Sequence, residues 1–143
     1  KTSAKIDRYK GKVIVQTYKY VRPQETGNKT DIRWLALYNG SIGLMVKGLP
    51  VFDGSVHHYD YALLDYYKGS QLHGKTDITK GDQIDLIVDH KQMGVGGDNS
   101  WGAKPHPKYT LPMDTTVYNL EYAIIPFNKK NELDALSRIN IDN

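Results

Sequence analysis

The sequence predicts a mainly antiparallel β domain. Two stretches alternate β-branched or aromatic residues with polar ones over the length of a strand, at 12–20 (KVIVQTYKY) and 30–38 (TDIRWLALY). Glycine, proline and asparagine separate stretches of this kind, and helical spacing is confined to short segments. With 143 residues and no cysteine, the chain has the length of one domain and must be held together by packing.

Each expected element has its own local signal. Asn39-Gly40 predicts a tight turn between 30–38 and IGLMVKG, so that 30–47 forms a hairpin. Leu133 and Leu136, three residues apart, give the C-terminal tail a helical spacing. The expected elements are strands at 12–20, 30–38, 84–90 and 117–126 and short helices at 60–68 and 131–139. We expect a boundary segment at 1–11, a β domain at 12–127 and a tail at 128–143.

Charge and hydropathy limit the classes of molecule that the chain is expected to bind. The 19 basic and 16 acidic residues are interspersed, and the nearest approach to a basic run is Lys129-Lys130, which favours a solvated surface over a nucleic-acid interface. No apolar run approaches the roughly 20 residues that a spanning helix needs. We therefore expect partners to include neither nucleic acid nor a membrane. The compartment stays open, because the chain begins at Lys1 without visible targeting information.

Two glycine-rich strings mimic nucleotide sites. GSQLHGKT at 69–76 fits the phosphate-loop pattern, but the polar segment DITKGDQ that follows it runs into a strand instead of opening a helix. GVGGDN at 94–99 begins like a dinucleotide fingerprint, but its sixth position is asparagine and a proline-punctuated loop follows. Neither pattern indicates a nucleotide site.

The histidines and aspartates suggest no catalytic or metal centre either. His57 and His58 are adjacent, and adjacent side chains of a strand point to opposite faces, so the two cannot chelate one ion. Acidic pairs such as Asp85 and Asp89 are near in sequence, which does not by itself make a cleft. We predict no catalytic residue and no metal ligand in this chain.

A more specific signal lies at 93–101, MGVGGDNSW, where a flexible segment ends on a large aromatic residue. The longer run DHKQMGVGGDNSWGAKPHPKYTLP at 89–112 resembles a signature of the C-terminal, small-chain region of bacterial β-galactosidases of glycoside hydrolase family 2. YVRPQETGNKTDIRWLAL at 20–37 and VFDGSVHHYDYALLDYYKGSQL at 51–72 resemble other parts of the same region. Together the matching stretches extend over about residues 18 to 126.

The resemblance implies a fold and an activity. The fold is an all-β antiparallel super-sandwich of the galactose-mutarotase-like type, of which 12–127 is the C-terminal portion, with one or two short helices. The parent enzyme is a retaining β-galactosidase whose two catalytic carboxylates lie in a separate (β/α)8 barrel, so this segment alone is expected to be inactive. Implied partners are a lactose-like β-galactoside, the other domains and further copies of the full enzyme; Mg and Na ions are expected elsewhere in the parent and no cofactor here.

Trp101 is the site residue that the resemblance implies. The loop would carry it to the mouth of the barrel as part of a sugar platform, and an aromatic face suits the C–H face of a pyranose. The other loop residues are expected to shape the backbone, the glycines by permitting positive φ and close backbone approach and the polar residues through bonds to nearby backbone groups. These loop-shaping residues are Gly94, Gly96, Gly97, Asp98, Asn99 and Ser100. Trp34, inside a strand, is assigned to the core.

Two other functions remain open at this stage. The chain can be a stand-alone carbohydrate-binding module with no enzyme attached. It can also be a purely structural or oligomerising domain in which Trp101 never meets a substrate, because resemblance of a domain does not fix its function.

Overall fold

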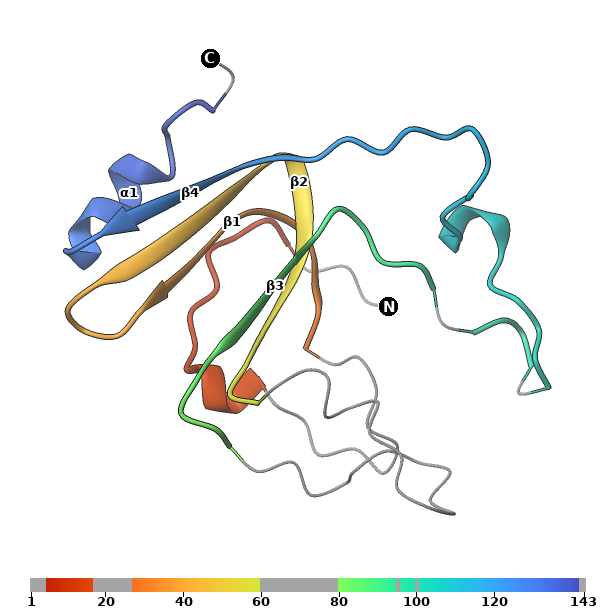
Figure 1. The fold of residues 1–143 in the computed structure, drawn as a ribbon, viewed down its shortest axis with the longest axis horizontal. Coiled ribbons are helices and arrows are strands. Elements are labelled where there is room, and N and C mark those ends of the chain that lie inside the picture. The colour runs from red at the N-terminus through yellow and green to blue at the C-terminus, as the bar shows by residue number, and fades with distance from the viewer. Residues whose placement is uncertain (1–4, 17–26, 60–79, 95, 100, 142–143) are drawn as a thin grey trace. The chain divides into compact units, whose positions relative to one another are not determined.

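The computed structural model describes residues 5–16, 27–59, 80–94, 96–99 and 101–141 (Figure 1). They fall into two compact units, Lys1–Asn28 with Ser55–Ile87, and Lys29–Gly54 with Val88–Asn143. The strands are β1 (Lys29–Tyr38), β2 (Gly43–His57), β3 (Asp85–Asp89) and β4 (Glu121–Phe127), and they form one sheet in which β2 pairs with β1, β3 and β4. The described residues contain one short α-helix, so the all-β prediction is confirmed.

The expected hairpin is present. β1 and β2 run antiparallel, with Tyr38 opposite Gly43. The turn is closed by Asn39, whose Oδ1 accepts the N–H groups of Ser41 at 2.9 Å and Ile42 at 3.0 Å, while Gly40 adopts a φ of 105°. Asparagine and glycine therefore do at this turn what their sequence order predicts.

β1 is irregular in its first half. Its register against β2 shifts between Lys29 and Ile32 and again between Ile32 and Trp34. Asp31, within this bulge, has a φ of 57°, a conformation that residues with a Cβ rarely adopt. Its N–H donates to Oδ1 of Asp53 at 3.2 Å, so the bulge replaces a ladder bond by a bond to a side chain of β2.

The later strands are close to their expected places. β3 lies within 84–90, and β4 pairs with β2 from Gly43 opposite Phe127 to Leu49 opposite Glu121. β4 begins four residues later than the sequence predicts. Before it, the hydroxyl of Tyr118 donates to the carbonyl of Pro112 at 2.7 Å, which gives the preceding segment a local bond in place of a ladder partner.

The expected strand at 12–20 is wrong over its described part. Val13–Gln16 forms the 3-10 helix η1, and the N–H of Val15 donates to the carbonyl of Lys12 at 3.2 Å. Alternating β-branched residues favour a strand only where a partner strand supplies the ladder, and here the backbone bonds locally. Residues 17–20, like the expected helix at 60–68, lie outside the described residues.

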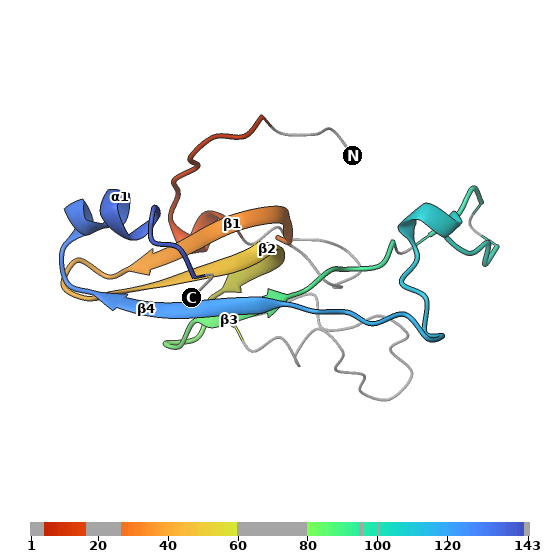
Figure 2. The same ribbon diagram turned by 90° about the horizontal axis from the view of Figure 1, so that it is seen from above.

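The C-terminal tail is helical over a short stretch. The 3-10 helix η4 (Lys130–Glu132) leads into α1 (Leu133–Leu136), which Figure 2 shows on one side of β1 and β4. Lys47 of β2 donates its Nζ to the carbonyls of Ser137, at 3.0 Å, and of Ile139. The lysine thus bonds one carbonyl at the C-cap of α1 and one just beyond it. No helix in the described ranges is long and apolar enough to cross a membrane.

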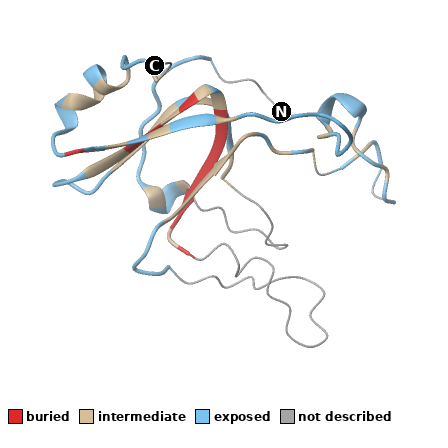
Figure 3. Cartoon of the chain, turned by 45° about the horizontal axis from the view of Figure 1, so that its top comes forward, coloured by how far each residue is buried: buried red, intermediate tan, exposed pale blue. Residues whose placement is uncertain are grey.

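The core is built around β2. Figure 3 shows the buried residues concentrated along this strand, which has neighbours on both sides. Trp34 is half-buried on β1, opposite Lys47, so it lies at the margin of the core. His57 is fully buried and stacks on Tyr59 with ring centroids 4.7 Å apart. The buried hydrophobic residues are Met45, Val46, Phe52, Val56, Tyr59 and Phe127.

The conformation of Asp31 yields a prediction about stability. Asp31→Gly should leave the free energy of unfolding unchanged or raise it by up to about 1 kcal/mol, because glycine has no Cβ to clash at positive φ. Asp31→Val should lower it by about 1–2 kcal/mol, although valine favours strands. Urea unfolding of the two variants measures the difference, and equal stability would contradict the positive φ.

Candidate functional site

The candidate site is the long connection between β3 and β4. It leaves the sheet after Asp89, extends away from the strands and returns to β4 at Glu121 (Figure 1). Its one short regular element is the 3-10 helix η3 (Pro107–Tyr109). Binding residues lie on connections of this kind more often than on the strands that they join.

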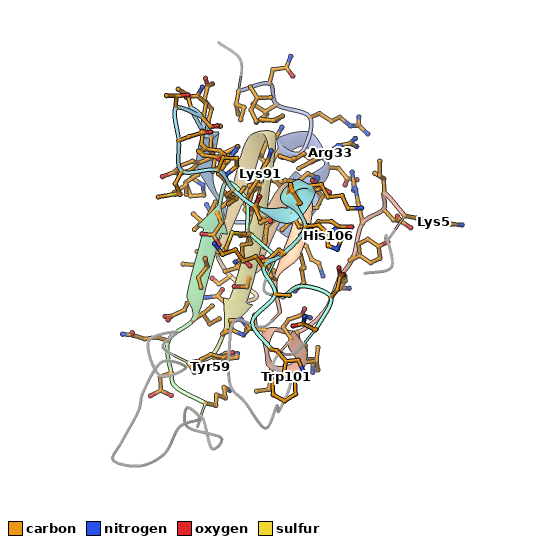
Figure 4. All side chains as sticks on the ribbon, turned by 90° about the vertical axis from the view of Figure 1, so that its right-hand side faces the viewer. Lys5, Arg33, Tyr59, Lys91, Trp101 and His106 are labelled. Atoms are coloured by element: carbon orange, nitrogen blue, oxygen red, sulfur yellow. The ribbon has the colours of Figure 1, made fainter. Side chains whose placement is uncertain are left out.

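Trp101 is the most exposed aromatic residue that the structure describes, with 92% of its surface accessible. Figure 4 shows its ring on the connection, outside the strands. The backbone beneath the ring is held: Oδ1 of Asn99 accepts the N–H of Trp101 at 2.9 Å and that of Ala103 at 3.4 Å. Asn99 therefore bonds local backbone groups. Ser100 lies outside the described residues.

The glycines shape the loop differently from the expectation. Gly94 and Gly97 are not at positive φ, whereas Gly102, which the sequence did not single out, has a φ of 96°. Gly97 is needed for close approach, because a Cβ there would lie 2.7 Å from the carbonyl oxygen of Ala103 and nearer still to that of Lys104. A Cβ at Gly94 would touch Tyr109 and Pro105 at 3.2–3.4 Å, and one at Gly96 would meet open space.

Asp98 bonds a side chain rather than the backbone. Its two carboxylate oxygens lie 2.8 and 2.9 Å from Nε2 of His106, and both residues are exposed. The bond that the carboxylate makes in the described residues is thus to a side chain, and a bond of Asp98 to the local backbone stays a prediction. Sequence offered no signal for the pair, because seven residues lie between the partners and the intervening chain must first reverse direction.

The outgoing and returning arms of the loop are joined nearer the sheet. The N–H of Gly94 donates to the carbonyl of Tyr109 at 2.7 Å, and Lys108 lies over the Tyr109 ring, 4.6 Å from its centroid. The Gly94–Tyr109 hydrogen bond, the Asp98–His106 pair and the close contact at Gly97 are successive links across the loop. Such links restrict the loop to few conformations.

The returning arm has its own turn. The carboxylate of Asp114 accepts the hydroxyl of Thr116 at 2.6 Å and its N–H at 2.9 Å, and these bonds, the hydroxyl bond first, lower the pKa of Asp114 below its ordinary value. Farther on, the Tyr118 ring meets that of His90 edge to face, with centroids 5.7 Å apart. This contact brings the end of the β3–β4 connection against its beginning.

The base of the loop is fixed by Asp53, a residue that sequence reasoning did not single out. Asp53 lies in β2 with only 7% of its surface exposed, and its Oδ2 accepts the N–H of Gln92 at 3.1 Å. The side chain of Gln92 in turn donates to Oδ2 of Asp89 at 2.9 Å, at the end of β3. An available signal was the position of Asp53, a lone carboxylate inside the run GLPVFDGSVH.

The arrangement offers an exposed aromatic face on a restrained loop, with a polar pair on the same loop. A ring in this setting suits a flat ligand with an apolar face. In the described part of the chain, no three His, Asp or Glu side chains gather in a way that would hold a metal ion.

Comparison with known proteins identifies relatives. Residues 1–124 match the family described as "Beta galactosidase small chain". The chain is 43% identical over 112 residues to a β-galactosidase of Priestia megaterium, covering 78% of this chain and 10% of that protein. It is 37% identical over 99 residues to the β-galactosidase BgaC of Bifidobacterium adolescentis (66% and 9%) and 33% identical over 118 residues to a β-galactosidase of Vibrio cholerae (82% and 10%).

The chain thus spans about a tenth of the length of these relatives. The matched family region ends at residue 124, within β4, so η4 and α1 follow outside it.

Two neighbouring glycines test the geometry of the loop. Gly97→Ala should loosen the loop, because the added Cβ must displace the carbonyls of Ala103 and Lys104, whereas Gly96→Ala, facing open space, is the matched control. Hydrogen exchange across 96–106 should rise in the first variant and stay unchanged in the second. Equal exchange in the two variants would show that close packing at Gly97 does not hold the loop.

Proposed function

The chain belongs to the β-galactosidase small-chain family, and on that premise we propose that it contributes the Trp101 loop to the sugar-binding site of a β-galactosidase. In this proposal the hydrolysis of terminal β-D-galactosides is carried out by a barrel domain elsewhere in the parent enzyme. Two carboxylates about 5–5.5 Å apart would act there as acid/base and nucleophile of a retaining mechanism. The substrate is a lactose-like β-galactoside.

The observation that carries the proposal is the combination of an exposed ring with a fixed backbone at Trp101. The indole is 92% exposed, while Asn99 holds the backbone N–H of the same residue. A core tryptophan would be buried, and a tryptophan on a mobile loop would lose conformational entropy on binding a ligand. An exposed ring on a backbone that is held in place supports a role in contact with another molecule.

A sugar fits this surface for a chemical reason. One face of a galactose or glucose ring presents C–H groups, which pack against an aromatic face without directional demands, while the hydroxyls bond elsewhere. Such a contact tolerates variation in the group attached to galactose. The exposed Asp98–His106 pair adds hydrogen-bonding groups to the same loop.

Replacing Trp101 in the full-length enzyme tests the proposal. Trp101→Ala should lower kcat/KM by tens of times, corresponding to a lost contact of about 2 kcal/mol, and should leave the melting temperature nearly unchanged because the ring contributes little to the core. Trp101→Tyr, which keeps an aromatic face, should recover much of the loss. Initial rates with lactose and with a chromogenic galactoside give kcat and KM.

Met113→Ala is the matched control, because Met113 is 96% exposed on the same connection but outside the 93–106 loop. It should retain normal kinetics. If Trp101→Ala keeps normal kinetics but melts many degrees lower, the chain is a structural domain instead. If the isolated chain binds lactose and no longer protein carries it, the chain is a stand-alone carbohydrate-binding module.

A further inference from the structure

We propose that Asp53 is a positioning residue for the sugar site: its buried carboxylate fixes the base of the loop and thereby the place of Trp101. The inference rests on the proposed function of Trp101 and adds to it a residue that contacts no sugar. Asp53 lies near the middle of β2, the strand that carries most of the core.

Each oxygen of the carboxylate accepts one backbone N–H. Oδ1 accepts the N–H of Asp31 at 3.2 Å and Oδ2 accepts the N–H of Gln92 at 3.1 Å. Within the described residues, Asp53 has no cationic partner, so these N–H dipoles are its stabilising contacts there. A carboxylate that is 93% buried loses its water and depends on such bonds. The two backbone segments are consequently held to β2 by one side chain.

Gln92 is the point at which this bond reaches the loop. It directly precedes Met93, and two residues later the N–H of Gly94 is bonded to the carbonyl of Tyr109. From there the links at Gly97, Asp98 and Asn99 continue to Trp101. Because the loop is linked internally, a displacement at Gln92 should move the loop as a body. A displaced indole would lose part of its contact with a sugar, because dispersion attraction falls steeply as the separation grows.

The chemistry of the carboxylate suggests a nearly isosteric test. Asp53→Asn keeps the shape but has one carbonyl oxygen and one NH2 group, and the NH2 group cannot accept a bond from either N–H. In the full-length enzyme we expect kcat/KM to fall about 10-fold, mainly through a higher KM, since the positioned contact is one of binding. Ser55→Ala, a change at another buried polar residue of β2, is a control that should keep normal kinetics.

A second pair of variants removes the same bond without touching Asp53. Gln92→Pro lacks the N–H that Oδ2 accepts, while Gln92→Ala keeps this N–H and loses only the side-chain bond to Asp89. Gln92→Pro should raise KM as Asp53→Asn does, and Gln92→Ala should not. These two Gln92 variants also test the proposal if Asp53→Asn fails to fold.

The double variant Asp53→Asn/Trp101→Ala separates positioning from general stability. If Asp53 acts through Trp101, the double variant should be no worse than Trp101→Ala, within about 2-fold. If the two losses multiply, or if Asp53→Asn keeps the normal KM, the proposal is overturned.

Hydrogen exchange distinguishes the failure of this inference from that of the proposed function. If Trp101→Ala alone leaves kcat/KM unchanged, the proposed sugar contact of Trp101 is wrong. Faster exchange across 93–106 in Asp53→Asn would then still establish Asp53 as the anchor of the loop, and unchanged exchange would remove that role as well.

Discussion

One carboxylate in the middle of an apolar strand holds backbone N–H groups from two distant parts of the chain. A buried Asp53 without these bonds would cost several kcal/mol, and each charge-assisted bond returns roughly 1.5–3 kcal/mol. The bulge of β1 at Asp31 and the chain at Gln92 are therefore both held to β2 through this one side chain. Asp31 accepts an unfavourable φ within this arrangement, which indicates that bonding the carboxylate outweighs the local strain.

The loop beyond Gln92 is restrained by bonds rather than by burial. Its links run from Gly94 with Tyr109, through Asp98 with His106, to Asn99 beneath Trp101. Most of its side chains remain exposed, so the segment keeps a defined shape without a core of its own. A surface of this kind is suited to present one ring to a ligand, because ordering has occurred before the ligand binds.

The sequence was sufficient for features that rest on local chemistry. Asn39-Gly40 determined the hairpin, and Asn99 had a short polar side chain able to reach backbone groups two residues on. The sequence failed where the partner was distant: Val13–Gln16 lacked a neighbouring strand, the pairing of Asp98 with His106 had no local signal, and Asp53 gained its role only when β1 and the loop came together. At Gly97 the backbone requires close approach, and positive φ is found at Gly102.

The most direct measurement is a crystal structure of the full-length parent enzyme with a non-hydrolysed β-galactoside in its active site. We expect the indole of Trp101 to lie against the C–H face of the sugar, at a carbon–carbon separation of about 4 Å, with Gln92 still bonded to Asp53. A structure in which Trp101 packs against another domain, away from the bound sugar, would contradict its place in the binding site.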